Sequence, residues 1–152
     1  MTLGAVRPDS WNVPLFLHAV GAMVLVGALI VVAWTLVKAW RGDPHGFTFL
    51  AARVLMLVAI PAFIVMRVGA QLIADKEIPE KSDPTWIGIG FSASDGGFVF
   101  LVITSILVGM ATRRLRRDPQ ATPRHIRVAA VLTLIPLAAY LVAIWAMTTK
   151  PV

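Results

Sequence analysis

Four long apolar runs, separated by short polar segments, dominate the pattern of residues along this chain. A helix needs about 20 consecutive, mostly apolar residues to cross the hydrocarbon core of a bilayer, and each run reaches that length. We predict membrane-spanning helices at about residues 13–37, 49–74, 93–112 and 128–147. Because an open sheet edge cannot be satisfied in lipid, these spans predict an all-α, integral membrane four-helix bundle. The short connections indicate one transmembrane domain over residues 1–152.

Capping signals and prolines refine these boundaries. Three dipeptides offer an N-cap side chain followed by proline at the first helical position, where the missing N–H costs nothing: Asp43-Pro44, Asp83-Pro84 and Thr122-Pro123. The third helix is therefore expected to start near residue 84, which makes it longer than the bilayer is thick. Either its first turns project beyond the membrane, or four glycines between residues 88 and 97 divide it in two. Pro61 and Pro136 lie in mid-span and should kink their helices.

The composition agrees with a membrane protein, and the placement of its charge sets the topology. The chain is 58% hydrophobic and 14% charged, with a net charge of +6, whereas soluble domains are about 25% charged. Nine Lys or Arg residues flank the first and third connections, and four lie on the other side. The positive-inside rule then predicts both termini outside and both basic loops in the cytoplasm. We therefore interpret the Arg113–Arg117 cluster as a topology signal on lipid headgroups, and we expect no nucleic-acid partner.

Four polar side chains inside the spans need a physical account: His18, Arg67, Gln71 and Asp95. An ionisable group at the centre of a span costs about 2.5–3.5 kcal/mol on insertion scales, so Arg67 should be paired. Asp95 is the carboxylate nearest its depth, and we predict an Arg67–Asp95 pair in the outer leaflet, supported by Gln71, Ser92 or Ser94. Such a pair either fixes helix register or lines a ligand or ion site.

His18 belongs to a stripe with heptad spacing on one face of the first span, which directs it into the bundle. Its members are His18, Gly21, Leu25, Ala28, Val32 and Thr35. Two roles for His18 remain open. It donates a hydrogen bond to Asp95, Tyr140 or a backbone carbonyl, or it is an axial ligand of a haem or a metal. The other histidines, His45 and His125, lie at the cytoplasmic side, so one haem cannot be held by two histidines.

The third span is rich in small residues four positions apart, which lets helix backbones approach closely. The pairs are Gly90 and Ser94, Ser92 and Gly96, Ala93 and Gly97, and Ser105 and Gly109. This pattern indicates either packing within the chain or a seam between two copies of it. The chain has no cysteine, which excludes disulfides and thiolate metal sites. No phosphate-binding loop or catalytic constellation is present, so the sequence favours a protein without enzymatic activity.

The run Leu15-Phe16-Leu17-His18-Ala19-Val20-Gly21-Ala22, followed by Gly27 and Trp34, resembles the first span of small bacterial four-helix membrane proteins. These uncharacterised proteins are grouped with copper-resistance protein D and the bacterial haem-binding protoporphyrinogen oxidase. The resemblance implies a haem or metal role for His18 alone, and a location in the inner or plasma membrane of a bacterium.

Together these features predict a multi-pass membrane protein with an outward-facing polar pocket. Its expected lining is His18, Arg67, Gln71, Asp95 and Tyr140. The leading functional hypothesis is binding of a cofactor or small ligand, haem being the first candidate through His18. The alternatives are a transporter or channel for a small solute or ion, and a ligand-free accessory subunit of a membrane complex that docks through its third helix.

Overall fold

The computed structural model of the chain describes residues 9–77, 85–121 and 124–149, and every regular element within them is helical. A short 3-10 turn, Asp9–Trp11, leads into α1, Asn12–Arg41. The second span comprises α2 (Pro44–Val54), the π-helical segment η2 (Leu55–Ala59) and α3 (Ile60–Glu77). The third and fourth spans are α4 (Thr85–Arg117) and α5 (His125–Thr149). Four helices are thus long and apolar enough to cross a membrane, which confirms the predicted fold class.

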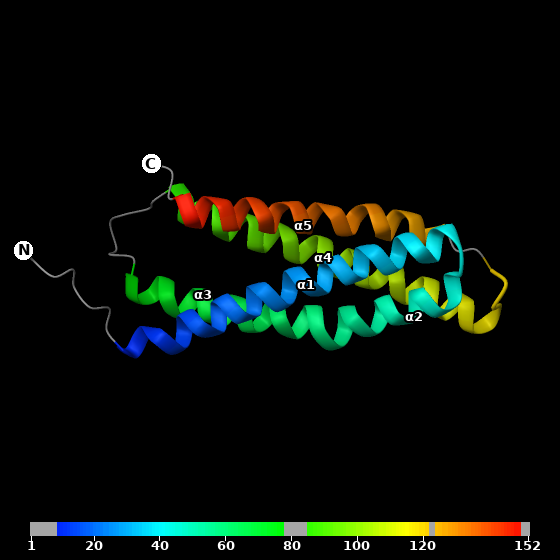
Figure 1. Cartoon of the computed structure of the whole chain (residues 1–152), viewed down its shortest axis with the longest axis horizontal. Coiled ribbons are helices and arrows are strands. Elements are labelled where there is room, and N and C mark those ends of the chain that lie inside the picture. Colours follow the sequence, from blue (N-terminus) through cyan, green and yellow to red (C-terminus); the bar gives the residue numbers. More distant parts are fainter. Residues whose placement is uncertain (1–8, 78–84, 122–123, 150–152) are drawn as a thin grey trace, which may run out of the picture.

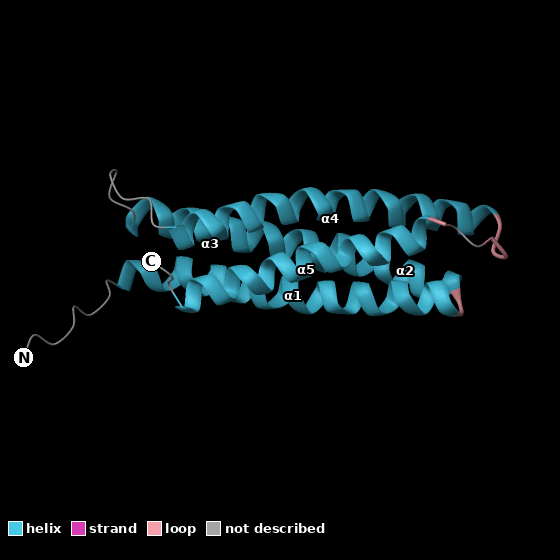
Figure 2. Ribbon diagram, turned by 90° about the horizontal axis from the view of Figure 1, so that it is seen from above, coloured by secondary structure: helices cyan, strands magenta, loops and turns pink. Residues whose placement is uncertain are grey.

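The four spans lie side by side along one long axis (Figures 1 and 2). Around the bundle, α1 packs on α2, α3 and α5, whereas α4 packs mainly on α5 and on α2. The start of α1 and the end of α5 lie together at what we call the N/C end (Figure 1). The connections from α1 to α2 and from α4 to α5 lie at the opposite end, which we call the basic end because it holds the nine clustered Lys and Arg residues.

The helices are longer than the predicted spans, and one predicted start is confirmed. Asp43 caps α2 by accepting a hydrogen bond from the His45 backbone N–H at 2.9 Å, and Pro44 takes the first helical position. The Asp83-Pro84 and Thr122-Pro123 signals lie outside the described residues. The glycines of α4 do not divide it, since the helix is continuous from Thr85 to Arg117. The expected alternative of two pieces is therefore wrong, because helical hydrogen bonding satisfies the backbone in lipid and outweighs the cost of about 1 kcal/mol per glycine.

A π-helical segment lies just before the proline of the second span. Pro61 has no N–H to donate, and its ring would collide with the carbonyl four residues earlier in a regular helix. Immediately before it, the Ile60 N–H bonds to the Leu55 carbonyl five residues back, which widens the turn at that point. The irregularity expected near Pro61 is present as this π segment. Pro136, by contrast, lies within an uninterrupted α5.

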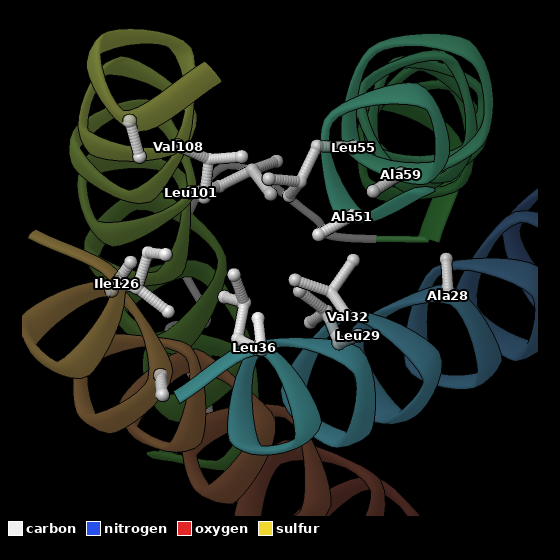
Figure 3. Packing of buried hydrophobic residues seen from close by; sticks show 14 of the residues in the cluster. Ala28, Leu29, Val32, Leu36, Ala51, Leu55, Ala59, Leu101, Val108 and Ile126 are labelled. Carbon is white, nitrogen blue, oxygen red and sulfur yellow. The ribbon is translucent and has the colours of Figure 1, made fainter. Parts of the chain in front are cut away.

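Aliphatic side chains from all four spans meet along the middle of the bundle (Figure 3). The largest of them are fully or almost fully buried: Leu25, Leu29, Leu36, Leu55, Leu101 and Leu115. The stripe predicted on the first span faces this core, since its members from Gly21 to Thr35 are buried. The Thr35 hydroxyl donates to the Val31 and Val32 carbonyls, so its burial leaves no donor unpaired.

The small residues of α4 fall on two different faces. Gly90, Ser94 and Gly97 are buried, and α5 is the helix on which α4 packs most extensively, so this face serves packing within the chain. Gly88 and Gly96 are exposed, and a Cβ atom added at either would meet no other atom. Packing within the chain therefore accounts for the small residues on the buried face of α4. The alternative role, a seam between two copies of the chain, stays a prediction.

Candidate functional site

α1 and α3 cross at backbone contact near the N/C end. A Cβ atom added to Gly21 would lie 2.6 Å from the Met66 backbone nitrogen, and one added to Gly69 would lie 2.5 Å from the His18 backbone nitrogen. Contacts this short leave no space for a methyl group, so only glycine permits the observed approach. Gly21 belongs to the inward-facing stripe predicted on the first span, whereas no sequence pattern identified Gly69, the glycine that faces His18.

This close crossing brings the His18 ring to a backbone carbonyl. The Nδ1 atom of His18 lies 3.1 Å from the Met66 carbonyl oxygen. A carbonyl can only accept, so Nδ1 carries the hydrogen in this bond. In the neutral ring, Nε2 then keeps its lone pair, and the bond to Met66 holds the ring in one orientation. Of the partners left open by the sequence, the structure selects the backbone carbonyl and neither Asp95 nor Tyr140.

The predicted ion pair joins α3 to α4. Arg67 Nη2 lies 3.4 Å from Asp95 Oδ1, with the Arg67 side chain 31% exposed and that of Asp95 65% exposed. Arg67 Nη1 also donates to Gln71 Oε1 at 3.3 Å, and Gln71 Nε2 donates to Asp75 Oδ1 at 2.9 Å. The predicted support by Gln71 is present. These groups form a polar ladder along α3 whose base is the pair with Asp95.

Long side chains, rather than close backbones, span the seam between α3 and α4, since the two helices contact each other at few points. The Arg67 guanidinium lies 4.7 Å from the centre of the Phe91 ring, a cation–π distance. One turn deeper, the rings of Phe63 and Phe98 stack with their centres 4.9 Å apart. The seam is thus bridged by two aromatic contacts and one ion pair.

Tyr140 of α5 rests against α4. A Cβ atom added to Gly97 would lie 2.6 Å from the Tyr140 hydroxyl oxygen, so the ring end rests on the bare backbone of α4. The Tyr140 hydroxyl and the Ser94 hydroxyl are buried, and neither has a hydrogen-bond partner among the described residues. Of the supports that the sequence left open for the ion pair, Gln71 is therefore used and Ser94 is not. Buried hydroxyls without partners are uncommon and indicate a place where water or a ligand group can bind.

These contacts place groups from all four spans at one level of the bundle. His18 on α1 bonds to Met66 on α3, whose neighbour Arg67 pairs with Asp95 on α4. Two residues further along α4, Gly97 meets Tyr140 on α5. We call this layer the polar layer: His18, Met66, Arg67, Ser94, Asp95, Gly97 and Tyr140. It lies toward the N/C end of the bundle, and its members Met66 and Tyr140 also belong to the apolar core; its predicted place in the outer leaflet stays a prediction.

The polar layer does not have the composition of a bare metal site. Among residues 9–77, 85–121 and 124–149, no three His, Asp or Glu side chains gather closely enough to hold a metal ion. His45 lies at the basic end, where its ring packs 4.8 Å from that of Phe49, and His125 begins α5 at the same end. His18 is therefore the histidine of the polar layer, as the sequence predicts.

Comparison with known proteins adds no assignment. No protein-family model matches the chain, and no curated protein and no solved structure matches it. The functional reading therefore depends on the geometry described above.

Proposed function

We propose that this membrane protein binds a cofactor or small ligand in the polar layer, with haem as the first candidate and Nε2 of His18 as its axial ligand. The observation that carries the proposal is the hydrogen bond from His18 Nδ1 to the Met66 carbonyl at 3.1 Å. A ligating histidine usually donates its other ring N–H to a carbonyl or carboxylate, which fixes the tautomer and directs the free nitrogen at the metal.

The donor set suits a metal that arrives inside a macrocycle. A bare transition metal generally needs three or four protein ligands, and the polar layer supplies one imidazole. A porphyrin brings its own four nitrogen ligands, so a single histidine suffices on the protein side. When bound, haem would supply redox or gas-binding chemistry at its iron, while His18 would hold it and Arg67 would offer a cation to its carboxylates.

The packing restricts where such a ligand can enter. α1 and α3 touch at backbone distance, and Tyr140 closes the space beside Gly97 between α4 and α5. Between these two helix pairs, α3 and α4 are bridged by side-chain contacts at this level. A planar ligand therefore enters between the helix pairs, where side chains rather than backbones move aside. The unpartnered Ser94 and Tyr140 hydroxyls would donate to its polar groups.

An absorbance scan tests the haem assignment. The protein is purified in detergent after expression with added haem, alongside His18→Ala and the matched control His45→Ala, which removes a histidine at the other end of the bundle. We expect a Soret band in the wild type and in His45→Ala, its loss in His18→Ala, and its partial return when free imidazole is added. A wild type without a Soret band, or an unchanged band in His18→Ala, refutes the assignment.

One observation favours a second candidate, a pathway for a small polar solute or ion. The hydroxyls of Thr104 on α4 and Thr48 on α2 are also buried without hydrogen-bond partners among the described residues, so such hydroxyls occur beyond the polar layer. Leu29, Leu55 and Leu101 of the apolar core are fully or almost fully buried. Transport would be supported by a flux through proteoliposomes that exceeds the flux through empty liposomes and is reduced by Thr104→Val. A flux equal to that of empty liposomes for each of several ions would exclude it.

A further inference from the structure

The basic end carries far more positive than negative charge. Its cations are Lys38, Arg41, Arg53, Arg113, Arg114, Arg116, Arg117, Arg124 and Arg127, and its carboxylates are Asp43 and Asp118. Both carboxylates are engaged by backbone: Asp43 accepts from the His45 N–H and Asp118 accepts from the Gln120 N–H at 3.1 Å. In the described part of the chain, none of the nine cations forms an ion pair, because the one ion pair found there joins Arg67 and Asp95. The positive charge at this end is therefore available to bind an anionic partner outside the chain.

Two of these arginines are held over aromatic rings of a neighbouring span. The Arg116 guanidinium of α4 lies 5.5 Å from the centre of the Phe49 ring of α2. The Arg127 guanidinium of α5 lies 4.9 Å from the centre of the Trp40 ring of α1. Both arginines are exposed, so each stacks one face on a ring and leaves its N–H donors available. Stacking restricts the rotamers of a long side chain, which lowers the entropy lost when those donors bind an anion.

These two seats, Arg116 on Phe49 and Arg127 on Trp40, lie on different seams of the bundle. The first joins α2 to α4 and the second joins α1 to α5. Each lies where an apolar span meets its basic flank, the level at which aromatic residues gather at a membrane surface. Exposed apolar side chains lie beside each seat: Leu50 follows Phe49 and is 43% exposed, and Val131 lies one turn beyond Arg127 and is 54% exposed. A seat thus combines a cation at headgroup depth with apolar surface beside it.

We propose that each seat binds the phosphate of an anionic phospholipid in the leaflet at the basic end, with the acyl chains along the apolar surface of the seam. A planar guanidinium matches two phosphate oxygens at once, and the excess charge attracts headgroups that carry net negative charge. A nucleic acid fits less well, because the ring faces that would stack on bases are occupied by guanidinium groups, and the two seats lie on separate seams.

The test titrates delipidated protein with phosphatidylglycerol or phosphatidylcholine of identical acyl chains and counts retained lipid by native mass spectrometry. The site variant is Arg116→Gln with Arg127→Gln. The matched control is Arg113→Gln with Arg117→Gln, which removes the same charge from exposed arginines of the same end that stack on no described ring. We expect the wild type to retain two phosphatidylglycerol molecules, the site variant to bind them about tenfold more weakly, and the control to change by about twofold or less.

Several results would overturn the proposal. Equal losses in the two double variants would mean general attraction by charge and no seats. Equal retention of the two lipids would mean that binding does not depend on the net charge of the headgroup. Displacement of phosphatidylglycerol by excess inorganic phosphate would assign the seats to a free anion. Circular dichroism checks that both variants fold; if the site variant does not, the Arg116→Lys with Arg127→Lys variant keeps the charge, loses the planar fork and should show an intermediate loss.

Discussion

Replacing Gly21 by alanine should loosen the crossing of α1 and α3, and the structure allows the effect to be estimated. The added Cβ atom would lie 2.6, 2.8 and 2.9 Å from the nitrogen, Cα and Cβ of Met66. Ordinary contacts of a Cβ atom begin at 3.4 Å, so the helices must separate by about 0.8 Å at this point. Because two of the three obstructing atoms belong to the backbone, a change of side-chain rotamer cannot relieve the clash.

The expected magnitude follows from a matched comparison. Overpacking of this kind costs about 1–3 kcal/mol, whereas the change from glycine to alanine in a helix returns about 1 kcal/mol of propensity. Gly27→Ala, on the same helix, shares the propensity gain, but its Cβ atom would meet no other atom. The free energy of unfolding of Gly21→Ala should therefore be lower than that of Gly27→Ala by about 1–3 kcal/mol.

Unfolding by denaturing detergent, followed by circular dichroism, measures this difference. The same substitution displaces the Met66 carbonyl that accepts from His18, so any Soret band should weaken in Gly21→Ala and stay unchanged in Gly27→Ala. Equal stability of the two variants would refute the argument, because it would show that α1 and α3 do not meet at backbone distance.

Three further predictions concern other contacts. In a double-mutant cycle with Arg67→Gln and Asp95→Asn, the coupling in the free energy of unfolding should be about 1 kcal/mol or less, since the pair is partly exposed; a coupling of several kcal/mol would contradict this. Tyr140→Phe removes a buried hydroxyl that has no hydrogen-bond partner among the described residues. In detergent unfolding, the ligand-free variant should therefore be as stable as the ligand-free wild type or about 1 kcal/mol more stable. A clear loss of stability would mean that the hydroxyl does have a partner. Asp43→Ala should lower the free energy of unfolding by about 1 kcal/mol through loss of the α2 cap, whereas Asp43→Ser should retain most of it.

The sequence predicts the spans and the ion pair because both follow from the cost of polarity in lipid. Uninterrupted apolar runs have few alternatives to a spanning helix, and Arg67 has few carboxylates at its depth. The α2 cap is equally local, since Asp43 acts on a backbone N–H two residues away. The spans and the cap agree with the structure because each depends on one element and its solvent, and the ion pair agrees because Arg67 has few alternative partners.

Predictions that depend on how two helices approach each other are less complete. The partner of His18 is decided by Gly69, which lets the ring reach the Met66 carbonyl, and no pattern within the first span contains that information. Tyr140 shares the depth of the ion pair, but its hydroxyl rests beside Gly97 and finds no partner among the described residues. Local periodicity gives the face of a helix, whereas the closest contact on that face depends on a residue of another helix.

The π segment Leu55–Ala59 lets the second span hold one residue more than a regular helix with the same flanking faces. A π turn contains one residue more than the α turn it replaces, so deleting one residue within the segment would restore an α turn and leave the helix on either side facing its present neighbours. The same deletion in the regular part of α3 before Met66 would turn the two sides against each other by about 100°, and Met66, Arg67 and Gly69 would no longer face α1 and α4. The two shortened chains would have nearly the same length and hydropathy, yet only the second would lose the polar layer. A one-residue deletion in this span is thus tolerated or not according to whether it falls inside or outside the π segment, a constraint that hydropathy alone would never register.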